Sequence, residues 1–167
     1  VSGYITILVV PFILSASIAK EYRDAMEADE MMETIIVQPN IDPYNKFQAL
    51  TQSQQNAILL KQAEEMLQYR KNDSTAAPLL LLAPETFTSD IIVGQYDRSM
   101  TWRAFTSFLK DYPDVNLLFG ASSYDYIQSA LRPSHTARKV GDRMWVESHN
   151  SALMTDGTAR TEIFHKS

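Results

Sequence analysis

A carboxylate at the end of an apolar run is the first candidate for chemistry. Residues 79–85 read LLLLAPE, which places Glu85 two residues beyond a stretch without polar side chains. Reactive groups in layered α/β folds sit at the carboxyl ends of strands. A carboxylate flanked by leucines and Pro84 would be partly desolvated, which would raise its pKa towards the range of a general base. The alternative is an acid that caps a loop or pairs with an arginine.

The second candidate is Lys166, at the end of the sequence IFHK. Taken alone, a lysine in this position is a solvated residue of a strand.

Several other kinds of site are not expected. The chain has no cysteine, and therefore no disulfide, thiolate metal site or thiol nucleophile among its 167 residues. Its three histidines are too scattered to resemble a zinc motif, so no zinc site is predicted. The net charge is −5, and the nearest approach to a basic cluster, at 138–143, is interrupted by Asp142. Nucleic acid is therefore not an expected partner.

Alternating strands and helices must position the two candidates. A composition of 45% hydrophobic and 21% charged residues indicates one domain with a packed core. The predicted elements are strand 34–38, helix 47–71, strand 79–83, a helix capped by Ser99 or Thr101, and strand 115–121. The unbroken apolar run of the second strand indicates burial on both faces. This order predicts an α/β layered fold with parallel, crossover-connected strands.

The last part of the chain begins with a long polar and aromatic stretch, 122–149, to which no element is assigned. A hairpin is predicted after it. Its strands are NSALMT and TARTEIFHK, joined by a two-residue turn at Asp156-Gly157. Two segments that follow strands, 86–96 (TFTSDIIVGQY) and 122–134 (SSYDYIQSALRPS), have two interpretations. They are either arms that face lipid or loops that pack on the domain.

The N-terminal segment is apolar. Residues 4–19 (YITILVVPFILSASIA) carry no charge, and a membrane-spanning helix needs about 20 such residues. We therefore expect residues 1–19 to be the end of a transmembrane helix, in a piece of a longer protein. A signal-peptide core and a buried core helix are the alternatives. An acidic linker (20–33) is expected next, and then the N-terminal part of the α/β domain, 34–167.

Five short motifs are spread in order over 34–167: IIVQPNIDPYNKF, LLLLAPETF, LLFGASSYD, HNSALMTDG and FHK. Their order resembles that of the carbon–nitrogen hydrolase (nitrilase) superfamily. The chain looks most similar to the bacterial apolipoprotein N-acyltransferases, in which a nitrilase-like domain outside the cytoplasmic membrane follows membrane helices. The resemblance implies an α/β fold of the nitrilase-like αββα sandwich type, present in part and preceded by the end of a transmembrane helix.

The resemblance also implies roles for single residues. Glu85 matches the family's general base and acid, and Lys166 matches the lysine that stabilises the oxyanion. Phe47 corresponds to an aromatic residue suggested to contact the acyl donor, with a plain core aromatic as the alternative. Asn150 matches a strand asparagine and is expected to be structural. The family's cysteine nucleophile and a further glutamate follow the lysine and lie outside these 167 residues.

The implied reaction is a two-step acyl transfer without metal or cofactor. A thiolate takes an acyl chain from a membrane phospholipid as a thioester and releases a lysophospholipid. The N-terminal amine of a diacylglyceryl-cysteine lipoprotein then takes the chain as an amide and frees the thiol. The implied location is the bacterial inner membrane, with the domain on the periplasmic side, and these 167 residues alone should be inactive. The alternatives are a nitrilase-superfamily amidase acting on small amides, and a non-catalytic, membrane-tethered α/β binding module.

Overall fold

The chain divides into two compact units, Val1–Met31 and Met32–Ser167. The computed structural model describes residues 2–28, 32–41, 50–71 and 78–166. The first unit contains helix α1 (Ser2–Ala28), which runs through Pro11 without a break. The predicted end of a transmembrane helix lies in α1. Among the described residues, no helix combines the length and the apolar character needed to cross a membrane.

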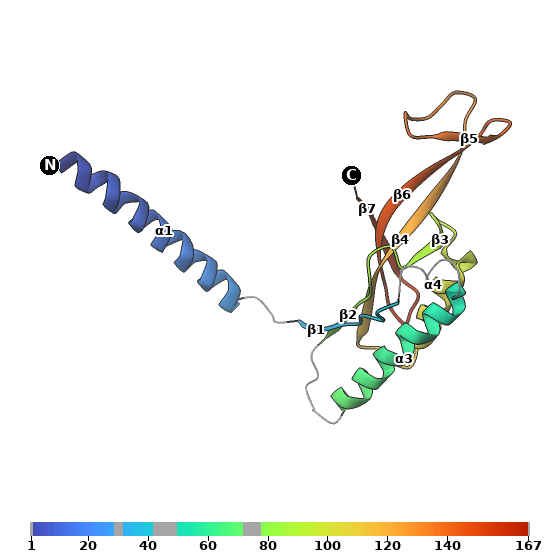
Figure 1. Ribbon diagram of the computed structural model, residues 1–167, viewed down its shortest axis with the longest axis horizontal. Coiled ribbons are helices and arrows are strands. Elements are labelled where there is room, and N and C mark those ends of the chain that lie inside the picture. Colours follow the sequence, from blue (N-terminus) through green and yellow to red (C-terminus); the bar gives the residue numbers. More distant parts are fainter. Residues whose placement is uncertain (1, 29–31, 42–49, 72–77, 167) are drawn as a thin grey trace. The chain divides into compact units, whose positions relative to one another are not determined.

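The second unit is a mixed α/β domain built on a seven-stranded sheet (Figure 1). The strands are β1 (Glu33–Ile36), β2 (Leu79–Leu82), β3 (Thr88–Ile92), β4 (Val115–Gln128), β5 (Arg138–Gly141), β6 (Met144–Thr155) and β7 (Thr161–His165). The helices are α3 (Gln52–Lys71), the 3-10 turn η1 (Tyr96–Arg98) and α4 (Met100–Leu109). The strand order is β1-β2-β4-β6-β5, with β3 beside β4 and β7 beside β6.

The strands run in both directions. β1 is parallel to β2, and both β2 and β3 are parallel to β4. β6 is antiparallel to β4, and it pairs antiparallel with β5 and β7. The predicted parallel arrangement of the first part is therefore confirmed. Parallel neighbours need a crossover connection, and α3 supplies it between β1 and β2.

Helix α4 begins where its capping residue predicts. Ser99 is the N-cap, and its Oγ accepts a hydrogen bond from Trp102 N at 2.9 Å. The carboxylate of Asp90, on β3, accepts bonds from Met100 N and Thr101 N at 2.8 and 3.3 Å. Both contacts satisfy amide groups that the first turn of a helix leaves unpaired. They also attach β3 to the start of α4.

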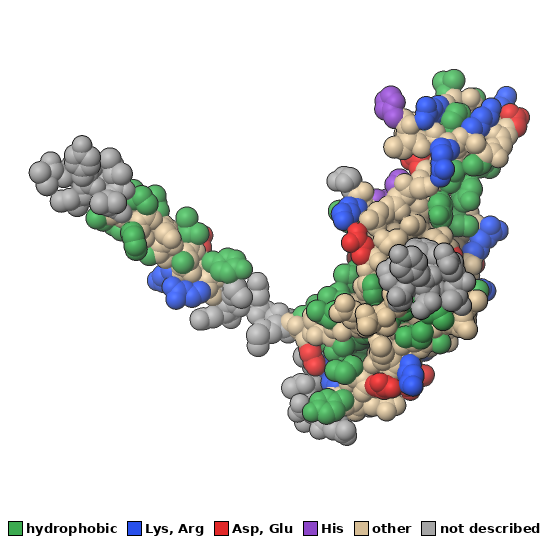
Figure 2. Space-filling view, viewed as in Figure 1, with side chains coloured by type: hydrophobic (Ala, Val, Ile, Leu, Met, Phe, Trp, Pro, Cys, Tyr) green, Lys and Arg blue, Asp and Glu red, His purple; other side chains and the backbone are tan. Residues whose placement is uncertain are grey.

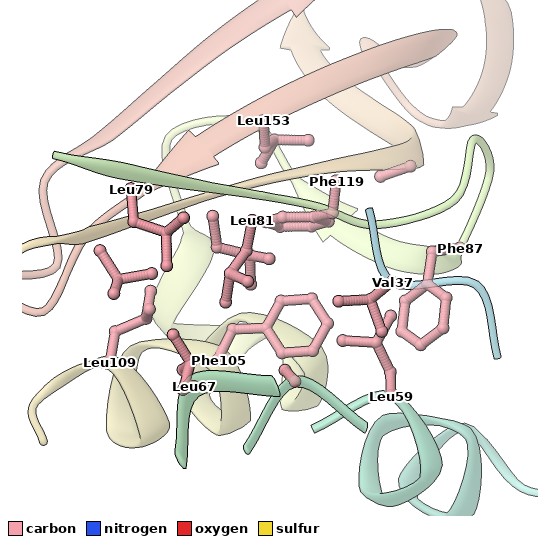
Figure 3. Packing of buried hydrophobic residues seen from close by; sticks show 14 of the residues in the cluster. Val37, Leu59, Leu67, Leu79, Leu81, Phe87, Phe105, Leu109, Phe119 and Leu153 are labelled. Carbon is pink, nitrogen blue, oxygen red and sulfur yellow. The ribbon is translucent and has the colours of Figure 1, made fainter. Parts of the chain in front are cut away.

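The hydrophobic core lies between one face of the sheet and the two helices α3 and α4 (Figure 3). Leu79, Leu81 and Phe119 of the sheet are at most 1% exposed and lie opposite Leu59 of α3 and Phe105 of α4. The rings of Phe105 and Phe119 meet edge to face, with centroids 5.0 Å apart. The side chains of β2 alternate between buried and half-buried. The expectation of burial on both faces of this strand is therefore wrong, because α3 and α4 pack on the same face.

The polar and aromatic stretch 122–149, to which no element was assigned from the sequence, is largely made of strands. β4 continues to Gln128 and β6 begins at Met144, and their pairing runs unbroken from Leu117↔Thr155 to Gln128↔Met144. Of the two segments with open interpretations, 86–96 contains β3, and 122–134 is in large part the outer half of β4. Polar side chains are compatible with these strands, because backbone pairing satisfies the ribbon and most of its side chains are at least partly exposed.

The ribbon of β4 and β6 ends in the segment that carries β5. Figure 2 shows Lys and Arg side chains gathered at this end. They belong to an exposed segment, 129–143, that contains four basic residues and one acidic residue. The weak basic cluster of the sequence therefore lies at the end of the ribbon formed by β4 and β6. It is a local feature, since the net charge of the chain is −5.

The predicted hairpin is present, but its turn is longer than predicted. The last paired residues are Thr155 and Thr161, so five residues, 156–160, connect β6 to β7. Asp156 Oδ1 organises this loop by accepting bonds from Thr158 N and Oγ1 and from Arg160 N. A five-residue loop takes the place of the predicted two-residue turn, and the side chain of Asp156 stabilises it with these three hydrogen bonds.

Candidate functional site

The structure brings Glu85 and Lys166 together. Lys166 Nζ donates a hydrogen bond to Glu85 Oε1 at 3.1 Å, although the two residues are 81 positions apart in the chain. Asn150 Nδ2 donates to the same oxygen at 3.0 Å. The three side chains come from the β2–β3 connection, from β6 and from the residue after β7. One carboxylate oxygen therefore receives an ammonium donor and an amide donor.

A local bulge in the chain beside β4 positions Glu85. Gly120 N donates to Pro84 O at 3.1 Å, and Phe87 N donates to Gly120 O at 2.8 Å. Glu85 and Thr86 lie between these two bonds as extra residues, and Thr86 has a φ of 51°. Extra residues of this kind re-aim a side chain out of the ladder. The bulge thus turns Glu85 towards the sheet face that α3 and α4 leave open.

Gly120 makes this path of the chain possible. A Cβ atom at Gly120 would lie 2.5 Å from Thr86 N and 2.6 Å from Glu85 Cα. No side chain fits at such distances, so only glycine allows the backbone of Glu85 to cross this point of β4. This role was not predicted from the sequence, although a glycine inside an apolar strand is a recognised sign of close backbone approach.

Asn150 and Lys166 are held side by side by the ladder between β6 and β7. Lys166 N donates to Asn150 O at 2.8 Å, directly beyond the last paired residues of β7. The side chains of the two residues then reach the same oxygen of Glu85. Asn150 was expected to be structural, and in the structure its amide is part of the candidate site.

The three polar residues line a surface pocket of about 430 Å³ with apolar walls. Its apolar lining residues include Leu82, Ala83, Leu118, Ala152 and Phe164. The pocket is open, since the side chains of Glu85 and Lys166 remain 65% and 67% exposed. The expected desolvation of the carboxylate is therefore absent. The leucines around it belong to a sheet face that α3 and α4 do not cover.

The pKa of Glu85 is shifted in the opposite direction from the prediction. The hydrogen bond from Asn150, followed by the hydrogen bond and the charge of Lys166, lowers the pKa of the carboxyl below its ordinary value, and burial opposes this only weakly. Donors that favour the ionised form outweigh desolvation when the group is exposed. Glu85 is therefore an ionised proton acceptor at neutral pH, and a weak base.

Two further expectations concern residues or groups around the site. Phe47, the predicted contact to an acyl donor, lies outside the described residues. Within the part of the chain that the structure describes, no group of three or more His, Asp or Glu side chains is arranged to hold a metal ion.

Comparisons with known proteins do not assign the chain to a family. No protein-family model, no curated protein and no solved structure matches it. The resemblance to the nitrilase superfamily therefore rests on the order of the sequence motifs, and the mixed α/β fold and the contact between Glu85 and Lys166 are the structural facts beside it.

Proposed function

We propose that this chain carries the glutamate and the lysine of the active site of an apolipoprotein N-acyltransferase of the nitrilase superfamily. The observation that carries the proposal is the single oxygen of Glu85 that both Lys166 and Asn150 contact. The site lies where the parallel strand β2 ends, the usual position of reactive groups in layered α/β folds. An exposed ion pair contributes little to stability, so stability alone does not explain this convergence.

The walls of the pocket support an acyl chain as the substrate. Leu82, Leu118, Ala152 and Phe164 lie around the polar groups, and together they form an apolar surface directly beside the carboxylate. Apolar surface of this kind binds hydrocarbon by the hydrophobic effect, at roughly 25 cal/mol per Å² buried. A small polar amide, the substrate of the alternative amidase, would leave most of this surface without a partner.

The proposed chemistry requires a cysteine from sequence that follows Lys166 in a longer protein. Glu85 accepts the thiol proton and returns it to the leaving group, while Lys166 stabilises the oxyanion of each tetrahedral stage. A thiol has a pKa of about 8.5, so transfer to a carboxylate of lowered pKa is unfavourable. The ammonium of Lys166 compensates, because a neighbouring cation lowers a thiol pKa.

The proposed fold is the αββα sandwich of that superfamily. Parallel strands are normally covered on both faces, and in a sandwich a second sheet packs about 10 Å from the first. A second sheet over the rest of the open face, where Ile36 is 73% exposed, would enclose the pocket and desolvate Glu85. Under this proposal the domain lies on the periplasmic side of the bacterial inner membrane, with phospholipid as donor and lipoprotein as acceptor.

The test is acyl-enzyme formation in the full-length protein. The protein is incubated with phospholipid vesicles, and the added mass of the acyl thioester is followed over time. We expect Glu85→Gln and Lys166→Met each to slow this step by about 10²–10³. Glu162→Gln is the matched control, since it removes an exposed carboxylate of the same sheet that pairs with Arg160 at 2.6 Å.

Other outcomes would overturn the proposal. Undiminished thioester formation in Glu85→Gln excludes the carboxylate as the base. Release of ammonia from small amides, without transfer of an acyl chain to a lipoprotein, identifies the amidase alternative. Absence of any covalent intermediate in the unaltered protein identifies a binding module.

A further inference from the structure

A chain of buried hydrogen bonds lies on the opposite side of the sheet from Glu85. Ser123 Oγ on β4 lies 2.7 Å from Ser151 Oγ on β6, and Ser151 Oγ lies 2.8 Å from His165 Nδ1 on β7. Ser123 is fully buried and Ser151 is 4% exposed. The chain therefore joins three neighbouring strands through two buried serines and a half-buried histidine.

Each member on β6 and β7 is adjacent in sequence to a residue of the candidate site. Ser151 follows Asn150, and His165 precedes Lys166. Successive side chains of a strand point to opposite faces, so the backbone that presents Asn150 and Lys166 to Glu85 presents Ser151 and His165 to the other side. Ser151 and His165 are also paired across the two strands.

The ring of His165 is suited to accept the bond from Ser151. Burial, and then the neighbouring His149, lower the pKa of His165, while Asp125 opposes this shift. The imidazole is therefore neutral at pH 7, and its Nδ1 can accept a hydrogen bond from the hydroxyl group of Ser151. The rings of His149 and His165 pack against each other, with centroids 4.3 Å apart.

We propose that Ser123, Ser151 and His165 are positioning residues that hold the end of β7 against β6, so that Lys166 reaches Glu85. The last ladder bond of this strand, from Lys166 N to Asn150 O at 2.8 Å, lies directly beyond the Ser151–His165 pair. A strand end fixed only by that exposed bond would fray, and the ammonium would leave the carboxylate. The proposal rests on the proposed function in assigning catalytic value to the ion pair.

The test uses nuclear magnetic resonance of the 167-residue chain at pH 7. The carboxyl carbon resonance of Glu85 reports the contact with Lys166, and its value in Lys166→Met defines the broken contact. We expect Ser151→Ala and His165→Leu to move this resonance most of the way to that value. Exchange of the Lys166 amide hydrogen should become about two- to tenfold faster, as loss of one hydrogen bond predicts.

Two variants separate positioning from general stability. His165→Asn keeps a polar atom where Nδ1 lies and should restore the resonance of the unaltered chain. Thr155→Val removes a buried hydroxyl at the far end of the same strand pair, where Thr155 Oγ1 lies 3.2 Å from Thr161 Oγ1. This control should leave Glu85 and the Lys166 amide unchanged.

The proposal is overturned if Ser151→Ala and His165→Leu leave the Glu85 resonance in place, or if Thr155→Val moves it equally. If Ser151→Ala does not fold, Ser123→Ala interrupts the same chain one residue further away and decides the question. The proposed function is tested separately: full activity of Glu85→Gln would refute catalysis and leave the positioning result standing.

Discussion

The two faces of the sheet differ in what covers them. On one face, Leu79, Leu81 and Phe119 are at most 1% exposed beneath α3 and α4. On the other face, Ile36 is 73% exposed and Phe164 is 71% exposed. The strands β2 and β4 supply side chains to both faces, because successive side chains of a strand alternate; Leu82 and Leu118 lie on the open face and are half-buried. The covered face holds the domain together, and the open face carries the candidate site.

This difference separates the packed part of the fold from the candidate site. Glu85, Asn150 and Lys166 meet on the open face, where solvent has access. Ser151 and His165 are adjacent to two of them in sequence and point to the other side, where they contact each other. A polar site on an open face can therefore be held in place from behind.

The largest expected effect comes from truncating leucines on the two faces. Leu81→Ala should cost about 2–5 kcal/mol of unfolding free energy, because a fully buried leucine leaves a cavity. Leu82→Ala should cost less than half as much, since its side chain is only half-buried. Urea unfolding of both variants checks this comparison. Equal costs would mean that the second face is covered in solution.

A methyl group at Gly120 should disturb the candidate site and lower the stability of the domain. Gly120→Ala places an atom against the backbone of Glu85 and Thr86, which should cost about 1–3 kcal/mol and displace the carboxylate. The control is Gly141→Ala, whose new Cβ would meet only Met144 Cβ at 3.4 Å. Chemical denaturation and the titration of Glu85 measure both effects. An unchanged Glu85 titration in Gly120→Ala would contradict the role given to this glycine.

The contribution of Glu85 to the pH dependence of folding stability should weaken when one of its hydrogen-bond donors is removed. Its pKa is lower in the folded chain than in the unfolded chain, so the ion pair stabilises the folded state above the unfolded pKa, and this stabilisation is lost as pH falls through the lowered folded pKa. Lys166→Met and Asn150→Ala should each raise the Glu85 pKa, as measured by carbon-13 titration. High salt should reduce only the part of the Glu85 pKa shift that is due to the charge of Lys166, because the ion pair is exposed. A pKa unaffected by either substitution would show that the contacts do not form in solution.

The smallest expected effect is at an exposed aromatic residue of the open face. Phe164→Ser should change the unfolding free energy by no more than about 0.5 kcal/mol. It should also reduce concentration-dependent self-association, because exposed apolar patches promote contacts between molecules. Ile163→Ser, on the neighbouring residue packed against the core, is the comparison and should be clearly more destabilising. Sedimentation velocity and urea unfolding give the two readouts.

Local sequence patterns predicted the first part of the fold because its signals are strong there. The leucines of 79–82 form a parallel strand beside β1 and β4, and Ser99 caps α4 as expected. The outer half of β4 and the start of β6 were not predicted as strands, since serines and charged residues interrupt their alternation. Only their mutual pairing makes these segments regular.

The sequence singled out two residues of the candidate site, but the predicted direction of the Glu85 pKa shift was wrong. The motifs singled out Glu85 and Lys166, which the structure places in contact. Their exposure depends on which face of the sheet the helices cover, and no local pattern records that choice. The roles of Gly120 and His165 also depend on neighbours far away in the sequence.

By itself, the sequence determined the types of most elements in the first part of the domain and the identity of two polar residues at their ends. Propensity, capping and apolar runs act over a few residues, and they can be read without neighbours. The tertiary structure alone decided that Glu85 is exposed, that its pKa is lowered and that a serine–histidine chain lies behind Lys166. Burial and charge interactions depend on distances through space, which are set only when the strands pair and the helices pack.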